Sequence, residues 1–257
     1  MENGKALDQL DELGWVKLDA VLDARLVNDL VKDFRVACDK TREIRASQGQ
    51  VGNSYGTVNH LLSFGSSFQE FLERRYCDSL ISEFFKGKYI LNIFGGVNLT
   101  KEKTSYVRNV HRDLRSFSGD NHVMLQLLVM LHDFTPENGA TYVLSGSHKR
   151  EMKPNDVDFF KCAEQLVGKA GDIVLFNSNL WHAAGENTTE GDRVGLTLAY
   201  TKPYFKPQLD YVRFFGDKIY TFSEHLKQLF GLYSQVPLSL EEWYVDSSER
   251  KYKKDQG

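Results

Sequence analysis

The chain has 257 residues, 41% of them hydrophobic and 26% charged, so it can bury a substantial core, while its net charge of −3 provides no basic field for nucleic acid. No stretch reaches the ~18 apolar residues of a membrane span, the N-terminus has no apolar signal core, and the 3 widely separated cysteines match neither a zinc site nor a disulfide framework. We therefore expect a cytoplasmic protein without nucleic-acid or membrane partners, and the sequence leaves its oligomeric state open.

The first 87 residues are expected to form a helical layer. Residues 14–18 alternate in polarity as a strand does. Asp23 is a candidate helix cap that precedes apolar residues on one helical face: Leu26, Val27, Leu30, Val31 and Phe34. Residues 45–65 are rich in Gly, Ser, Asn and Gln and are predicted to form a long loop. Ser67–Glu70 matches a capping box, which predicts the start of a second helix.

Short apolar runs alternate with turn residues from residue 88 to about residue 205, which predicts a β-sandwich or barrel. The runs are 89–93, 123–131, 141–144, 172–176 and 194–201. Residues 206–257 are predicted to be a helical segment packed on this core. Because no repeat or linker divides the chain, we expect one domain over residues 1–257, mainly β with flanking helices.

A candidate metal site is formed by His111, Asp113 and His182. His111 and Asp113 are two residues apart, so on a strand or its frayed end both side chains point to the same side. His182 follows the strand-like run 171–176 and can supply a third ligand. Two histidines and one carboxylate leave open coordination positions, which is the ligand set of non-haem iron(II) oxygenases. An isolated His-x-Asp pair is weak support, since such pairs also occur in charged loops without a metal.

Arg193 lies eleven residues after His182, at the start of the apolar run 193–200. An arginine in such a run is unfavourable unless a carboxylate pairs with it, and the guanidinium can bind a carboxylate by two parallel hydrogen bonds. A dicarboxylic keto acid would provide that carboxylate. The combination of all four residues at these spacings is far less common than either part alone.

Together with four short motifs, these residues make the chain similar to the phytanoyl-CoA dioxygenase family, a branch of the iron(II)/2-oxoglutarate oxygenases. The motifs are His111-Arg112-Asp113, Asn138-Gly139-Ala140-Thr141, Ser145-Gly146-Ser147-His148 and Gly171–Phe176. The resemblance covers about residues 13–211. It implies a double-stranded β-helix, that is, a jelly-roll or cupin-like core, over about residues 88–205.

The resemblance implies that His111, Asp113 and His182 bind Fe(II) and are the catalytic residues. It implies that Arg193 pairs with the C5 carboxylate of the co-substrate 2-oxoglutarate. Halogenating relatives replace the carboxylate ligand with a small residue, and this chain retains Asp113. We therefore expect a hydroxylase or another oxidative catalyst, not a halogenase.

Two further positions match residues that help to bind the co-substrate in relatives, Thr141 and Asn109, although an ordinary strand residue and a turn residue are the alternatives. The chain also departs from the family pattern. Arg112 stands where a glutamine is common, Leu128 where some relatives have a tryptophan, and Ala184 where some have a serine. These departures affect secondary contacts to the co-substrate and leave the three metal ligands unchanged.

The expected function is that of a non-haem Fe(II)/2-oxoglutarate-dependent dioxygenase. It would use O2 to hydroxylate an unactivated C–H bond of a small-molecule metabolite while 2-oxoglutarate is decarboxylated to succinate. A catalytically inactive β-helix binding protein and a metal-dependent hydrolase with the same triad are the alternatives, and neither accounts for Arg193. The sequence does not identify the substrate, whose pocket we expect to lie between residues 45–65, residues 114–122 and the C-terminal helices.

Overall fold

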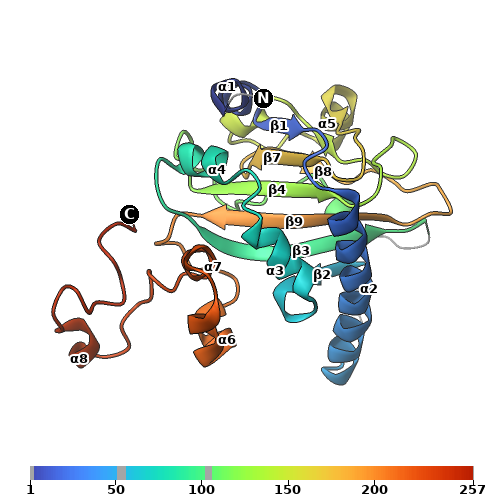
Figure 1. Cartoon of the computed structure of the whole chain (residues 1–257). Helices are drawn as coiled ribbons and strands as arrows, with labels where there is room; N and C mark the ends of the chain where they lie inside the picture. Colours follow the sequence, from blue (N-terminus) through green and yellow to red (C-terminus); the bar gives the residue numbers. More distant parts are fainter. Residues whose placement is uncertain (1–2, 51–55, 102–105, 257) are drawn as a thin grey trace.

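Two antiparallel sheets form the centre of the molecule, of which the computed structural model describes residues 3–50, 56–101 and 106–256. The larger, six-stranded sheet has the order β1 (Trp15–Leu18), β7 (Ile173–Asn177), β4 (Met124–Met130), β9 (Arg193–Thr201), β3 (Ile90–Leu99) and β2 (Thr57–Asn59) (Figure 1). The smaller, three-stranded sheet has the order β6 (Glu164–Gln165), β5 (Tyr142–Val143) and β8 (His182–Ala183). The predicted strands at residues 14–18 and within 88–205 are therefore confirmed.

Helices flank the sheets on several sides. The four that precede residue 88 are α1 (Asn3–Leu13), α2 (Ala24–Ser47), α3 (Ser66–Glu73) and α4 (Asp78–Phe85). The later helices are α5 (Asp156–Cys162), α6 (Tyr211–Phe215), α7 (Glu224–Leu229) and α8 (Leu240–Trp243). In Figure 1, α2, α3 and α7 lie across one face of the larger sheet, and α8 belongs to a C-terminal segment that extends away from it. No helix in the described part of the chain is long and apolar enough to span a membrane.

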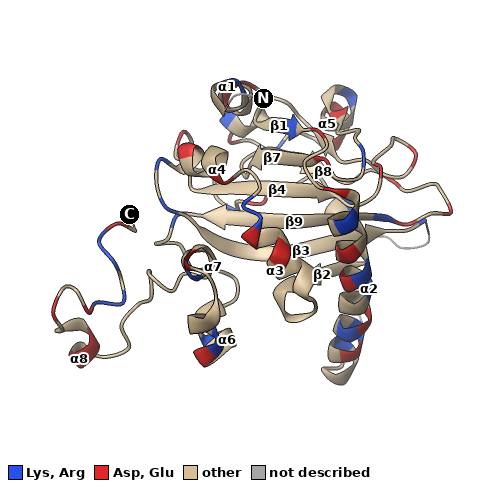
Figure 2. Cartoon of the chain, viewed as in Figure 1, with Lys and Arg blue, Asp and Glu red and all other residues tan. Residues whose placement is uncertain are grey.

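The alternation of side chains along the central strands separates two hydrophobic clusters. In β4, Leu125, Leu127 and Val129 join the cluster that faces the helices, whereas Leu128 and Met130 join a second cluster on the opposite face. Because both faces are buried, these strands are continuous apolar runs. Figure 2 shows the consequence: charged residues gather on the helices and loops, and the central strands are almost free of them. The site described below lies on the face of the second cluster.

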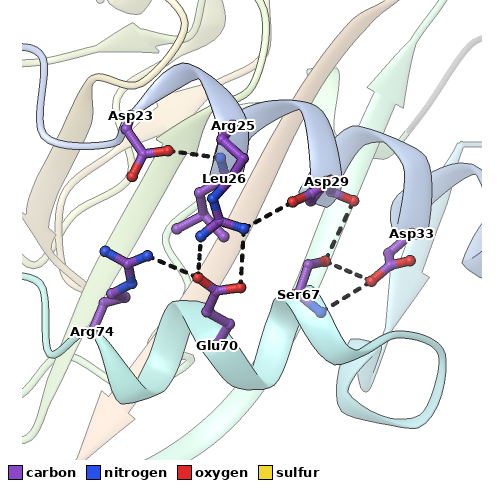
Figure 3. A network of polar contacts seen from close by, with 8 residues as sticks. All are labelled: Asp23, Arg25, Leu26, Asp29, Asp33, Ser67, Glu70 and Arg74. Atoms are coloured by element: carbon purple, nitrogen blue, oxygen red, sulfur yellow. Dashed lines mark hydrogen bonds and ion pairs between the residues drawn. The ribbon is translucent and has the colours of Figure 1, made fainter.

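A polar network joins α2 to α3 and corrects the predicted capping box (Figure 3). The N-cap of α3 is Gly65, and Asp33 of α2 supplies the acceptor at this helix end: its Oδ2 accepts from the N–H of Ser67 at 3.0 Å and from the Ser67 hydroxyl at 2.6 Å. Glu70 instead forms ion pairs with Arg25 and Arg74. The local motif was misleading because a carboxylate from another helix supplies the acceptor.

The predicted loop over residues 45–65 was wrong at both of its ends. Helix α2 continues to Ser47, and residues 57–59 form β2, which pairs with β3. Residues 51–55 lie outside the described part of the chain. The start of α2 is as predicted, because Asp23 accepts a hydrogen bond from the backbone N–H of Leu26 at 2.9 Å.

Candidate metal centre

Three side chains that are distant in sequence converge between the two sheets. His111, Asp113 and His182 each offer one ligand atom, and these atoms lie within 4.8 Å of one another. The Asp113 carboxylate lies between the two rings, with Oδ1 3.8 Å from Nε2 of His111 and Oδ2 3.7 Å from Nε2 of His182. This convergence agrees with the prediction, which combined the His-x-Asp spacing, the strand-like run before His182 and the family resemblance.

Backbone hydrogen bonds hold the two ligand-bearing segments together. His111 and His182 form an isolated antiparallel bridge, in which each N–H donates to the carbonyl of the other at 2.9 and 2.8 Å. His182 is the first residue of strand β8, whereas His111 and Asp113 lie on irregular backbone, which is the second of the two settings, a strand or its frayed end, that the sequence left open. Directly paired residues on neighbouring strands have adjacent side chains, so the two imidazoles are adjacent by construction.

The protonation of both imidazoles suits metal binding. Nδ1 of His111 lies 2.7 Å from the carbonyl oxygen of Asn109, and Nδ1 of His182 lies 2.9 Å from that of Leu180. A carbonyl only accepts, so each Nδ1 carries the proton and each Nε2 presents a lone pair to the shared centre. Complete burial also lowers the pKa of His182, which keeps its ring neutral.

Arg193 is the first residue of β9 and is 3% exposed. Its Nη2 donates to the carbonyl of Gly139 at 2.9 Å, and its guanidinium lies 4.2 Å from the ring centroid of Phe134. Nε is buried without a partner, and no carboxylate of the described residues pairs with the side chain. Burial lowers the pKa of Arg193 to about 9. The guanidinium is therefore a buried cation without a carboxylate partner among the described residues.

Glycine is required at the acceptor of this bond. Gly139 has a φ of 88°, and a Cβ there would lie 2.8 Å from the carbonyl oxygen of Gly185. The Asn138-Gly139 motif thus forms a turn that points a carbonyl at Arg193. Neither this contact nor Phe134 was identified from the sequence, although the motif itself was a usable signal.

The two weaker predictions have different surroundings. Thr141 is 9% exposed and lies directly before β5, two residues after Gly139. Asn109 is exposed, and the contact that it makes to the site is the backbone carbonyl that accepts from His111. The positions of both residues are known, and their roles toward a co-substrate stay predictions.

A further motif supports the backbone next to His182. Ser147 is buried, and its Oγ accepts from the N–H of Trp181 at 3.0 Å. The ring of Phe176 contacts the ring of His182 edge to face, with centroids 5.1 Å apart. The motifs around residues 145–148 and 171–176 thus position the third candidate ligand. Phe176 was predicted as a strand residue, and its contact with the site was missed.

Comparisons of sequence and structure show which known proteins this chain resembles. The protein from Mycobacterium tuberculosis named "Uncharacterized protein Rv1501" is 30% identical over 268 residues, covering 100% of this chain and 98% of that protein. The structure of HygX from Streptomyces hygroscopicus, with nickel and 2-oxoglutarate bound, has a TM-score of 0.61 at 18% identity and covers 79% of this chain and 88% of HygX. The α-ketoglutarate-dependent epimerase SnoN from nogalamycin biosynthesis also has a TM-score of 0.61, at 17% identity, and covers 77% of this chain and 82% of SnoN.

These structural neighbours confirm the predicted fold class, a mainly β double-stranded β-helix with flanking helices. The family model for phytanoyl-CoA dioxygenase matches residues 10–195, which include all four central residues of the site: His111, Asp113, His182 and Arg193. This chain belongs to the phytanoyl-CoA dioxygenase family.

Proposed function

We propose that the protein is an Fe(II)/2-oxoglutarate-dependent dioxygenase in which His111, Asp113 and His182 bind the metal and Arg193 binds the co-substrate. One observation carries the proposal: three metal-ligating atoms converge within 4.8 Å on the same side of the sheet as a buried guanidinium that pairs with no carboxylate in the described part of the chain. A protein that only bound a metal would need the three ligands, but this function would not explain the buried guanidinium of Arg193.

The donor set fits iron. Two neutral imidazole nitrogens and one carboxylate are typical ligands of non-haem Fe(II) and occupy one face of its coordination sphere. Bound iron with 2-oxoglutarate and O2 would supply the oxidising power, with succinate and CO2 as co-products. The binding of nickel and 2-oxoglutarate by HygX supports this assignment.

The protein's own contribution is to bind and orient. The fork of Arg193 can bind the C5 carboxylate by two hydrogen bonds, and the paired charge offsets the cost of burying the guanidinium. Thr141 and Asn109 are proposed to add polar contacts to the same co-substrate. His111 and His182 are held in register by the backbone bridge between them, so the metal would enter a site that needs little rearrangement.

We place the substrate on the side of the metal away from Arg193. Alternate residues of β9 share the inner face, and Ala199 lies six residues, roughly 20 Å, beyond Arg193. On the neighbouring strand β4, Ala199 pairs with Gln126. Gln126 also pairs with Phe176 of β7, and the ring of Phe176 contacts His182. Gln126 is 6% exposed and its amide donates weakly to the sulfur of Met124 at 3.8 Å, so it can bind a polar group of the substrate.

The chemistry proposed is hydroxylation of an unactivated C–H bond of a small-molecule metabolite. Members of this fold also catalyse other outcomes, as the epimerase activity named for SnoN illustrates. The ligand set favours oxidation at carbon over halogenation, because Asp113 occupies the position that a halide would need.

The test is reconstitution under anaerobic conditions with Fe(II) and 2-oxoglutarate, monitored by the visible charge-transfer absorbance of the ternary complex, followed by exposure to O2 with a panel of metabolites. We expect the absorbance band and O2-dependent succinate release in the wild type, and neither in Asp113→Ala. An absence of the band in the metal-loaded wild type would refute the proposal. Activity that persists without O2 and 2-oxoglutarate would instead identify a metal-dependent hydrolase.

A further inference from the structure

The side chain of Arg112 connects the two segments that carry the candidate ligands, on the side that faces away from the metal site. Side chains alternate along an extended chain, so Arg112 points away from the centre to which its neighbours His111 and Asp113 point. Trp181 is related to His182 in the same way. The guanidinium carbon of Arg112 lies 4.9 Å from the ring centroid of Trp181 and 5.4 Å from that of Phe117.

Stacking is the interaction that holds this guanidinium. Among the described residues Arg112 has no carboxylate partner, and its Nη1 is buried without a hydrogen-bond acceptor. Trp181 is 7% exposed and packs with Val110, Phe159 and Ala183, which form a rigid base behind the site. A planar guanidinium stacks on an aromatic face more effectively than an ammonium does.

The backbone of the His111–Asp113 segment has few other supports. Its described hydrogen bonds to the rest of the protein are the His111–His182 bridge and the bond from the N–H of Leu114 to the carbonyl of Ser178 at 3.1 Å. Asp113, which lies between those two points, has no strand pairing of its own. The stacked side chain of Arg112 is therefore placed where the segment is least constrained.

We propose that Arg112 is a positioning residue that fixes the two ligands beside it against the segment bearing the third, through its stack on Trp181 and Phe117. The inference rests on the proposed metal-binding role of the triad. Residues that orient metal ligands commonly change metal affinity 10–100-fold when they are replaced. We expect a loss in that range when the stack is removed while the ligands are retained.

The experiment measures the Kd for Ni(II) by calorimetry on the metal-free full chain, without 2-oxoglutarate, together with its Tm. Arg112→Met keeps the length of the side chain but removes the planar charge, and we expect Ni(II) to bind about 10–100-fold more weakly. Arg112→Lys should recover part of the loss. Arg115→Met, at an exposed arginine on the same segment, is the matched control and should bind Ni(II) as the wild type does.

The outcomes separate this inference from the proposed function. If the wild type binds Ni(II) and Asp113→Ala does not, but Arg112→Met binds as tightly as Arg115→Met, the positioning role is refuted and the metal site stands. If Asp113→Ala binds as tightly as the wild type, the proposed site itself fails. Should Arg112→Met lower the Tm so far that binding is unreadable, Phe117→Leu removes one of the two stacking rings, and an unchanged Ni(II) affinity in that variant would then count against the inference.

Discussion

Replacing Arg193 with methionine should cost the ligand-free protein little or no stability and abolish its response to 2-oxoglutarate. The side chain is 3% exposed, has one backbone acceptor and an unpartnered Nε, and is supported otherwise by the ring of Phe134. A charge buried in this way is unfavourable in the absence of an anion. Methionine fills a similar volume without a charge.

The magnitude follows from these contacts. Replacement of a buried ionic group by an apolar one typically stabilises by about 1–4 kcal/mol, and the loss of the cation–π contact offsets about 2 kcal/mol of this gain, which leaves a net change of about −1 to +2 kcal/mol. At about 2–4 °C per kcal/mol for a chain of this size, the ligand-free Tm should change by roughly −4 to +8 °C. Removing one partner of a buried charge pair costs about 2–5 kcal/mol, so 2-oxoglutarate should bind at least about 30-fold more weakly.

The assay is thermal unfolding of wild type, Arg193→Met and Arg193→Lys, each with Ni(II), across a 2-oxoglutarate titration. Arg193→Lys keeps the charge but loses the fork, so it should show an intermediate affinity and no gain in ligand-free Tm. The reasoning is wrong if Arg193→Met retains the wild-type 2-oxoglutarate titration, since the guanidinium would then have a different anion or none.

Three further outcomes are expected. Ni(II) at about 100 times its Kd should stabilise the wild type by about 2.7 kcal/mol and leave the Tm of Asp113→Ala unchanged, a comparison that thermal unfolding can make. Asp33→Ala removes the hydrogen-bond acceptor at the start of α3 and should lower the free energy of unfolding by about 1–2 kcal/mol, as measured by denaturant titration. The control Asp39→Ala, on the exposed side of α2, should change the free energy of unfolding by less than about 0.5 kcal/mol. Gln126→Leu should raise the KM for substrate about tenfold and leave the KM for 2-oxoglutarate unchanged in steady-state kinetics; equal changes in both would contradict the placement of the substrate.

The strands and the convergence of the triad could be predicted because the signals are local. Strands buried on both faces are continuous apolar runs, and the His-x-Asp spacing fixes two side chains on one side of an extended segment. Arg193 was identified because it begins such a run, where a charged residue needs an explanation, and His182 was the candidate that follows the run 171–176.

The errors arose where partners come from distant segments. The capping box at Ser67–Glu70 was wrong because Asp33, on another helix, accepts the hydrogen bonds that a local cap would take. The Gly- and Ser-rich composition of residues 45–65 did not predict β2, whose pairing depends on β3. The stack of Arg112 on Trp181 joins residues that are far apart in sequence, and no pattern in either segment indicates it.

The position of Arg193 in the fold has a consequence for how rigid the two halves of the site are. Arg193 begins a strand that is hydrogen-bonded on both sides, by β3 and β4, so its amide neighbours should exchange with deuterium only through global unfolding. His111 and Asp113 lie on irregular backbone and should exchange through smaller, local openings. The part of the site around Arg193 would thus stay rigid, while the part around His111 and Asp113 could shift when a substrate binds.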